Sequence, residues 1–326
     1  MKKTFVFSML SAIMMLGNTS VVQAEKLGQY PDKPVTLVVP YSAGGSNDRF
    51  ARLVASGLTK ELGEPVVVDN RPGASGVTGS MYVARSQPDG YTLLLVSSSM
   101  TTNEAVRPRD DFKPLKDLAP VAMVAKGPFI VAVNNDFPAK TVEELVAMVK
   151  ANPGKYNYAS SGIGSSNQFA TESFKMMADL DIVHVPYKGM SQATTDLIGG
   201  QTDLLMASGP SLLPSIRGDK LRALGVTSLN ESPIAPGLVP MSSVAPGYEF
   251  DLWWGIFAPA DTPEPLVNFL NAQINKVLND PKMQETFLAD GAQATTDLSA
   301  ADFKKRIGDD INRWTDLAKR QNITVN

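Results

Sequence analysis

Short runs of aliphatic and β-branched residues alternate along the chain with segments in which apolar residues recur every three to four positions. In the first part of the chain, the runs at 35–39, 66–68 and 92–96 have the length and composition of buried strands. Helical spacing separates them, because apolar residues recur from 50 to 62 and a second helix is expected from 73 to 83. This order of strands and helices predicts a parallel sheet covered on both faces.

A second set of alternating elements follows in the middle of the chain. A strand is expected at 129–133 and a helix with one apolar face around 142–149, and shorter apolar runs predict strands near 156–159, 182–185, 204–206 and 221–226. Residues 208–247 carry many prolines and are interpreted as connecting structure.

The end of the chain supplies one more strand and two helices, at 253–257, 265–278 and 303–314. Two α/β units in one chain predict an α/β fold with two lobes that face each other across a cleft. Open α/β sheets bind ligands beyond the carboxyl ends of their strands. The loops that follow those strands are therefore the first candidates for a site.

The N-terminal residues have the pattern of a secretory signal peptide. Lys2 and Lys3 precede a mostly apolar run at 4–16, and Val22-Gln23-Ala24 supplies the small residues that a leader peptidase recognises. Cleavage is expected after Ala24, so that residues 1–24 are removed and the mature chain reaches the periplasm. The apolar run is shorter than the roughly 20 residues of a membrane span, and there is no Cys to carry a lipid anchor. An uncleaved N-terminal anchor is the less favoured alternative, and we expect no stable membrane insertion.

Composition excludes many enzymatic functions. The 326 residues are 43% apolar and 19% charged, with a formal net charge of -3, no Cys and one His. Without Cys there is no disulfide, thiol nucleophile or zinc–thiolate site, and a single His excludes a multi-histidine metal centre. The charge balance argues against nucleic-acid binding. We therefore expect no cofactor and no metal, and a chain of this length is expected to form two domains.

The loop between the first strand and the first helix has the composition of an anion site. It consists of Pro40, Tyr41, Ser42, Ala43, Gly44, Gly45, Ser46, Asn47 and Asp48. Paired glycines let the backbone approach a ligand, and the helix that follows directs its first amides and the positive end of its dipole outward. This arrangement suits a carboxylate or a phosphate. The alternative is an ordinary strand–turn–helix junction with a capping Ser or Asn.

A second loop of the same design stands at the corresponding place in the second unit. Residues 159–167 read Ala-Ser-Ser-Gly-Ile-Gly-Ser-Ser-Asn. Two such loops, one from each lobe, predict that amides and hydroxyls hold the two ends of one small anion. Neither loop completes a dinucleotide or Walker motif. A third glycine-rich segment, 73–79, is interpreted as a helix start packed closely on a neighbouring element.

The remaining candidates for recognition or chemistry are few. His184 lies in an alternating strand pattern and is interpreted as a structural residue rather than a ligand contact or catalytic base. Lys188 follows a strand end and is expected to steer anions toward the cleft, whereas Arg107 is interpreted as a solvated surface residue. For Trp253 and Trp254, alternation predicts that one indole lies in the core and the other walls the cleft, and the pattern leaves open which.

Several segments, in their order along the chain, resemble the Bug family of periplasmic solute-binding proteins from tripartite tricarboxylate transport systems. The matching segments are Tyr30-Pro31-Asp32-Lys33-Pro34, Val39-Pro40-Tyr41-Ser42-Ala43-Gly44-Gly45, Val68-Asp69-Asn70-Arg71-Pro72-Gly73-Ala74, Pro88-Asp89-Gly90-Tyr91-Thr92-Leu93, Val185-Pro186-Tyr187-Lys188-Gly189 and Gly255-Ile256-Phe257-Ala258-Pro259. The resemblance covers essentially the whole mature chain. It implies a two-lobed type II periplasmic-binding fold with a two-strand hinge. Residues 25–125 with 225–326 are expected to form one lobe, and 126–224 the other.

The same resemblance implies which residues line the ligand, with backbone amides of the two loops as the main donors. On the first lobe these are Tyr41, Ser42, Ala43, Gly44, Ser46 and Asn47, with Ser98, Met100 and Thr101 as wall residues. On the second side they are Ser161, Gly162, Ile163, Gly164 and Ser165, with Tyr187, Ser208 and Trp254 as further wall residues. One departure is that family members often carry a His soon after the third strand, where this chain has Met100-Thr101-Thr102-Asn103.

The sequence thus predicts a non-enzymatic, monomeric receptor for a small mono-, di- or tricarboxylate, aromatic and amino-acid-like acids included. It is expected to deliver this ligand to a membrane permease of the tripartite tricarboxylate type. Two alternatives stay open. One is a ligand sensor whose closed form docks on a signalling partner, and the other is a periplasmic hydrolase, which the single His and the lack of a serine motif disfavour.

Overall fold

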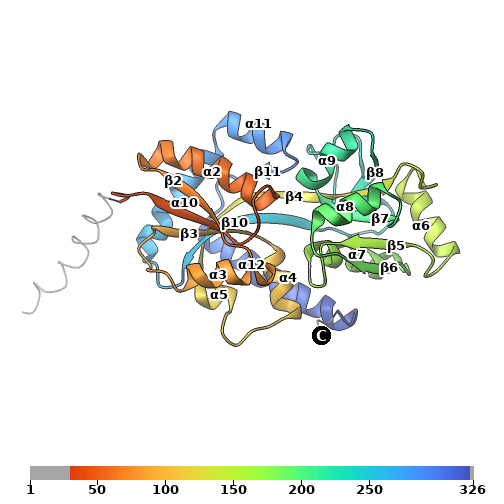
Figure 1. Ribbon diagram of the computed structural model, residues 1–326, viewed down its shortest axis with the longest axis horizontal. Coiled ribbons are helices and arrows are strands. Elements are labelled where there is room, and N and C mark those ends of the chain that lie inside the picture. Colours follow the sequence, from red (N-terminus) through yellow and green to blue (C-terminus); the bar gives the residue numbers. More distant parts are fainter. Residues whose placement is uncertain (1–29, 324–326) are drawn as a thin grey trace, which may run out of the picture.

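A computed structural model describes residues 30–323 of the chain. Within this range two α/β lobes lie side by side, and two long strands run from one into the other (Figure 1). The two-lobed α/β fold expected from the sequence is therefore confirmed. The predicted leader, residues 1–24, and its cleavage site after Ala24 lie outside the described residues.

The first lobe is built on the strands β1 (Val35–Val39), β2 (Val66–Asn70) and β3 (Thr92–Ser97), which pair in parallel in the order β2-β1-β3. The helix α2 (Ser46–Leu62) joins β1 to β2, and α3 (Val77–Ala84) joins β2 to β3. These are the elements that apolar periodicity predicted. The glycine-rich segment 73–79, which runs into the first turn of α3, also packs closely, as expected. A Cβ on Gly79 would lie 2.8 Å from both the Arg71 carbonyl oxygen and Pro40 Cβ.

The second lobe repeats the same alternation. Its strands β5 (Asn157–Ser160), β6 (Val183–Pro186), β7 (Leu204–Ser208) and β8 (Leu221–Val226) lie close to the predicted runs. Its helices are α6 (Val142–Ala151), α7 (Ser166–Ala178), α8 (Met190–Ile198) and α9 (Gly209–Arg217). Interpreting all of 208–247 as connecting structure was wrong for α9, where Pro210 occupies one of the first two helical positions that proline tolerates.

The two strands that connect the lobes are β4 (Leu118–Asn134) and β10 (Asp251–Pro259). The first half of β4 pairs with β10, and its second half pairs with β7 and β8. The chain between β8 and β10 stays with the second lobe: β9 (Val239–Pro240) pairs with β8, and the Tyr248 hydroxyl donates to the Ala170 carbonyl at 2.9 Å. The chain thus returns at β10, later than the expected boundary between 224 and 225. This proline-rich segment has neither helical nor strand periodicity, so the sequence does not indicate to which lobe it belongs.

The remaining elements are α4 (Ser99–Val106), α5 (Pro114–Asp117), α10 (Glu264–Leu278), α11 (Pro281–Ala289), α12 (Ala300–Arg320), the two-residue strand β11 (Gln293–Ala294) and the short 3-10 turns η1 (Ala74–Gly76) and η2 (Met241–Ser243). The long helix α12 contacts both lobes. Phe303 packs on Trp253 of β10, while Trp314 packs on Phe169 of α7. No helix within residues 30–323 combines the length and apolar character needed to cross a bilayer.

Candidate functional site: a cleft between the lobes

A cleft of about 570 Å³ lies between the lobes, where the residues that follow β1, β3, β5, β6 and β7 meet. Within the described chain, five helices present a first-turn residue to its wall, namely α2, α4, α7, α8 and α9. Each helix start carries amides without an intrahelical acceptor and the positive end of a dipole. Their convergence favours a bound anion.

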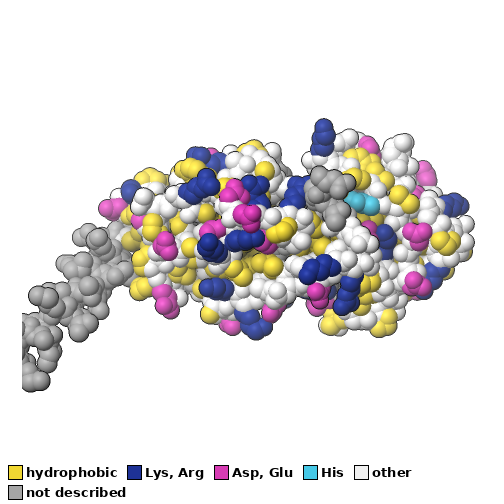
Figure 2. Space-filling view, turned by 90° about the horizontal axis from the view of Figure 1, so that it is seen from below, with side chains coloured by type: hydrophobic (Ala, Val, Ile, Leu, Met, Phe, Trp, Pro, Cys, Tyr) yellow, Lys and Arg dark blue, Asp and Glu magenta, His cyan; other side chains and the backbone are white. Residues whose placement is uncertain are grey.

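The side-chain charges of the wall reinforce this preference. Among residues 30–323 the wall contains two cations, Arg107 and Lys188, and no carboxylate. They come from opposite lobes, and neither forms an ion pair with another described residue. The face drawn in Figure 2 differs from this wall, since positive and negative side chains are interspersed over it. Anion attraction is therefore local to the cleft. From the sequence, Arg107 was interpreted as a solvated surface residue, because the helix α4 that places it at the wall was not predicted.

In the first loop, only part of the expected set of residues faces the cleft. The wall contains Tyr41, Gly45, Ser46 and Asn47, whereas Ser42, Ala43 and Gly44 are exposed outside it. The Gly44 amide already donates to Asp48 Oδ2 at 3.0 Å. The amides of Gly45, Ser46 and Asn47 have no acceptor among the described residues, and Asn47 Oδ1 is buried without a hydrogen-bond partner there.

Asp48 holds this loop against α2. Burial alone would raise its pKa, but hydrogen bonds from Arg52 at 3.1 and 2.9 Å and from the Gly44 amide outweigh burial, so the pKa is lowered. The carboxylate therefore stays charged and acts within the protein rather than toward a ligand.

The second loop is organised in the same way. Ser161, Gly162, Ile163 and Ser165 line the cleft, and Gly164 does not. The Gly162 amide donates to Ser160 Oγ at 3.1 Å, and the Gly164 amide donates to Gln168 Oε1 at 2.8 Å. These two glycine amides are therefore already hydrogen-bonded within the loop, although Gly162 lines the cleft as expected. The glycines instead provide the positive φ angles of the turn, +127° and +83°.

The donors left for a ligand in the second loop lie beside the glycines. The amides of Ser161 and Ile163 have no backbone acceptor in the described chain. Ser166, the first residue of α7, lines the cleft, and its hydroxyl is buried without a partner in that part of the chain. This arrangement gives the second lobe unpaired donors that mirror those of the first.

The wall residues expected from the resemblance divide into two groups. Tyr187 and Ser208 line the cleft as expected. After β3, the wall contains Asn103 rather than the expected Ser98, Met100 and Thr101. Ser98 and Thr101 are buried below the wall, where the Thr101 hydroxyl donates to the Ser98 carbonyl at 2.7 Å. Met100 faces a separate cavity of about 90 Å³ beside the cleft. The periodicity of α4, absent from the prediction, turns these side chains away.

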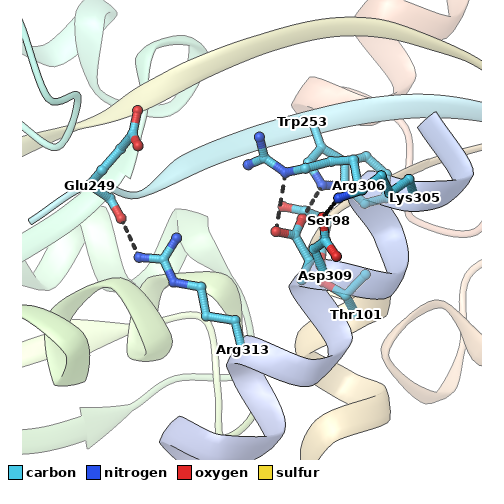
Figure 3. A network of polar contacts seen from close by, with 9 residues as sticks. Ser98, Thr101, Glu249, Trp253, Lys305, Arg306, Asp309 and Arg313 are labelled. Carbon is cyan, nitrogen blue, oxygen red and sulfur yellow. Dashed lines mark hydrogen bonds and ion pairs between the residues drawn. The ribbon is translucent and has the colours of Figure 1, made fainter. Parts of the chain in front are cut away.

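Neither adjacent indole reaches the cleft, so the prediction of Trp254 as a wall residue is wrong. Trp254 packs edge-on against Phe50 of α2, with ring centroids 4.6 Å apart. Trp253 points to the other side of the sheet, where its Nε1 donates to Asp310 Oδ2 of α12 at 2.7 Å; Figure 3 shows this indole beside Arg306. The two indoles do point to opposite faces of the sheet, as alternation predicts, but helices cover both faces of β10, so neither face is open to the cleft.

A Ser–His pair lies behind the cleft rather than in it. Ser160 Oγ lies 2.6 Å from His184 Nε2, but Ser160 is fully buried and does not line the cleft. A substrate in the cleft therefore has no access to this hydroxyl. Residues 30–323 also contain no cluster of three or more His, Asp or Glu side chains with the geometry of a metal site.

Comparison with known proteins agrees with this geometry. Residues 50–323 match the tripartite tricarboxylate transporter family receptor family, TctC. The chain is 36% identical over 295 residues to protein BugT of Bordetella pertussis, an alignment that covers 89% of this chain and 90% of BugT. It therefore belongs to the TctC family of two-lobed solute-binding receptors.

Solved structures show the same fold. Rpa4515 of R. palustris with adipate is 32% identical, with a TM-score of 0.84 over 90% of this chain and 99% of that one. The periplasmic binding protein BugD is 33% identical, with a TM-score of 0.80 over 90% and 99% of the two chains. MatC of Rhodopseudomonas palustris with bound malate is 29% identical, with a TM-score of 0.78 over 88% and 99%.

Proposed function

We propose that the protein is a monomeric periplasmic receptor that captures a small carboxylate between its lobes and delivers it to a tripartite tricarboxylate transport permease. The observation that carries this proposal is the wall of the cleft, where helix starts and two unpaired cations from opposite lobes meet no carboxylate among the described residues. Similarity to proteins solved with adipate and with malate supports a carboxylate as the ligand. No step of this function requires covalent chemistry, a cofactor or a metal.

The free donors suggest how the acid is held. One carboxylate group is bound by the amides of Gly45 to Asn47 and by the Ser166 hydroxyl, on opposite lobes. A second acid group, where the ligand has one, lies toward Arg107 or Lys188. A ligand that contacts both lobes favours the closed arrangement, because only that arrangement provides all of its contacts.

Binding is tested by thermal shift and calorimetry on the mature protein with adipate, malate, acetate, glucose and Mg²⁺. We expect the dicarboxylates to raise the melting temperature, since a ligand at about 100 times its Kd stabilises the folded state by roughly 2.7 kcal/mol. Acetate, which presents one acid group, should give a smaller shift. Stabilisation by glucose or Mg²⁺ alone, with none by any acid, would overturn the proposal.

Delivery requires a separate test, because a sensor would use the same closure. Membrane proteins captured by the mature chain with and without adipate distinguish the two roles. Ligand-dependent capture of a permease supports transport, whereas capture of a sensor kinase instead supports signalling.

A further inference from the structure

His184, the one histidine of the chain, lies behind the second loop and does not line the cleft. Its ring stacks on Tyr158 of β5, with centroids 4.7 Å apart and an interplanar angle of 17°. Both ring nitrogens have side-chain partners: Nε2 lies 2.6 Å from Ser160 Oγ, and Nδ1 lies 3.3 Å from Gln168 Nε2. These two partners are the same residues that hold the Gly162 and Gly164 amides.

The direction of every hydrogen bond in this group follows from the Gly164 amide. Its N–H donates to Gln168 Oε1, so the other end of that side chain is the NH₂ group, which donates to His184 Nδ1. A ring nitrogen that accepts carries no proton, so the proton of the neutral ring is on Nε2 and is donated to Ser160 Oγ. Ser160 Oγ also accepts the Gly162 amide at 3.1 Å, and its own hydroxyl faces the Gly162 carbonyl at 3.2 Å.

We propose that His184 is a positioning residue for the ligand: neutral and protonated on Nε2, it closes a hydrogen-bonded circuit that fixes Gly162 and Gly164, and its protonation opens that circuit and weakens carboxylate binding. The inference rests on the proposed function. A second proton on Nδ1 would face the Gln168 NH₂ group, and two donors cannot hydrogen-bond to each other. Gln168 would then have to turn over and withdraw Oε1 from the Gly164 amide. The loop that carries the free amides of Ser161 and Ile163 would lose this restraint.

The surroundings of the ring keep it neutral near pH 7. Burial lowers the pKa of His184 to about 4, with Glu172 opposing and Lys175 adding to that shift. Glu172, which faces the ring from α7, accepts hydrogen bonds from the Tyr158 hydroxyl at 2.6 Å and from Lys175 Nζ at 3.0 Å. Its charge is thus already compensated, and it stabilises an imidazolium only weakly. The circuit therefore opens only in acid.

Nuclear magnetic resonance tests the circuit directly, because a chain with one His gives one set of imidazole signals. We expect ¹⁵N-labelled mature protein at pH 7 to show a proton on Nε2 and an unprotonated Nδ1. Saturation with adipate should lower the His184 pKa further. About half of the free protein carries the extra proton at pH 4, so adipate affinity should fall about twofold more between pH 6 and pH 4 than it does in His184→Ala, where only the protonation of adipate itself contributes. A proton on Nδ1, or the same His184 pKa with and without bound adipate, would overturn the proposal.

Two substitutions separate positioning from mere packing. Gln168→Glu keeps an acceptor for the Gly164 amide but turns a carboxylate oxygen toward Nδ1. The His184 pKa should then rise above its ordinary value of about 6.5, and the loss of adipate affinity should move to correspondingly higher pH. His184→Ala should weaken adipate binding about tenfold at pH 7 and remove the pH dependence attributed to the ring. A purely structural residue would lower stability without moving the pH profile of binding, so an unmoved profile in Gln168→Glu sinks the proposal.

The outcomes distinguish this inference from the function on which it rests. If the wild-type chain binds neither adipate nor any other acid at pH 7, the proposed function fails. Two measurements then still test the hydrogen-bonded circuit. They are the tautomer of the His184 ring and the hydrogen-exchange rates of the Gly162 and Gly164 amides, which should increase in His184→Ala. If the wild type binds adipate and His184→Ala binds it equally well, only the positioning role fails.

Discussion

The backbones of Gly209 and Gly291 touch across the two lobes: a Cβ on Gly209 would lie 2.6 Å from the Cα of Gly291. Gly209 begins α9 in the second lobe. Gly291 follows α11, whose Phe287 packs on Phe50 of α2 in the first lobe. A few residues away, Arg217 of α9 donates to the Ala289 carbonyl at 3.4 Å. The lobes therefore meet at a close backbone contact as well as through β4 and β10.

Because of this contact, even a methyl group at position 209 should destabilise the protein. Gly209→Ala should destabilise the protein by about 1–3 kcal/mol, the usual cost of overpacking, and should move the lobes relative to each other. Urea denaturation measures the first effect and solution scattering with and without adipate the second. Gly199→Ala is the matched control, since its Cβ would meet only helix carbonyls at 3.6 and 3.7 Å. Equal stability of the two variants would contradict the prediction.

Gly45 is the position at which a side chain should block the ligand. It lines the cleft, its φ of -82° suits any residue, and a Cβ there would meet only the Ser42 carbonyl oxygen at 3.9 Å. Gly45→Val should abolish adipate binding in calorimetry with little change in the melting temperature of the free protein.

Gly44→Ala provides the matched comparison for Gly45→Val. At φ +87° and outside the wall, Gly44→Ala should cost about 1–2 kcal/mol of stability, because a Cβ is strained in the left-handed region, but should leave affinity within about twofold. If binding were lost in Gly44→Ala and kept in Gly45→Val, Gly44 rather than Gly45 would be the glycine that contacts the ligand.

Arg107 and Lys188 should contribute separately to ligand capture. Each Gln substitution should weaken adipate binding by about tenfold or more, because a hydrogen bond between charged groups is worth about 1.5–3 kcal/mol. Association rates should also become less sensitive to salt, which stopped-flow fluorescence measures. Lys220→Gln, at an exposed position outside the cleft, is the control and should change neither quantity. Loss of affinity in all three variants to the same degree would point to net charge rather than to the wall.

Trp253 should stabilise the fold through its indole N–H. Asp310 is only 4% exposed; burial raises its pKa, while Arg306 and the Trp253 hydrogen bond oppose the rise. Trp253→Phe removes that donor and should destabilise the protein by about 1–3 kcal/mol in urea denaturation. Trp314→Phe is the control because its Nε1 is buried without an acceptor among residues 30–323, so less should be lost. A larger loss in Trp314→Phe would show that ring packing, not the hydrogen bond, dominates.

His184 predicts a pH dependence of stability as well as of binding. Its pKa of about 4 in the folded chain lies below the ordinary value of 6.5. Between these values the unfolded chain binds a proton that the folded chain does not, so stability falls as the pH drops from about 6.5 to about 4. His184→Gln should flatten this part of the curve in urea denaturation at a series of pH values. Asp48, whose pKa is lowered, adds a loss at lower pH that should remain in the variant.

The sequence predicted the elements whose pattern is local. The strands β1, β2 and β3 and the loops after β1 and β5 follow from apolar runs, glycines and helix starts that lie within a few residues of each other. It did not predict which amides are free, because that depends on side chains such as Gln168 that fold back onto the loop. It also misplaced Trp254, since a strand covered on both faces has no solvent side for alternation to reveal.

The helix α12 is a further connection between the two lobes, besides β4, β10 and the contact of Gly209 with Gly291. It is anchored at Phe303 against β10 and, further along, at Trp314 against Phe169, and Arg313 donates to the Glu249 carbonyl at 2.7 Å where the chain leaves the second lobe (Figure 3). Two connecting strands alone would leave the lobes free to rotate relative to each other. A continuous helix that packs on both lobes restrains this rotation. Opening of the cleft would therefore require α12 to bend, or to slide against one of the two lobes.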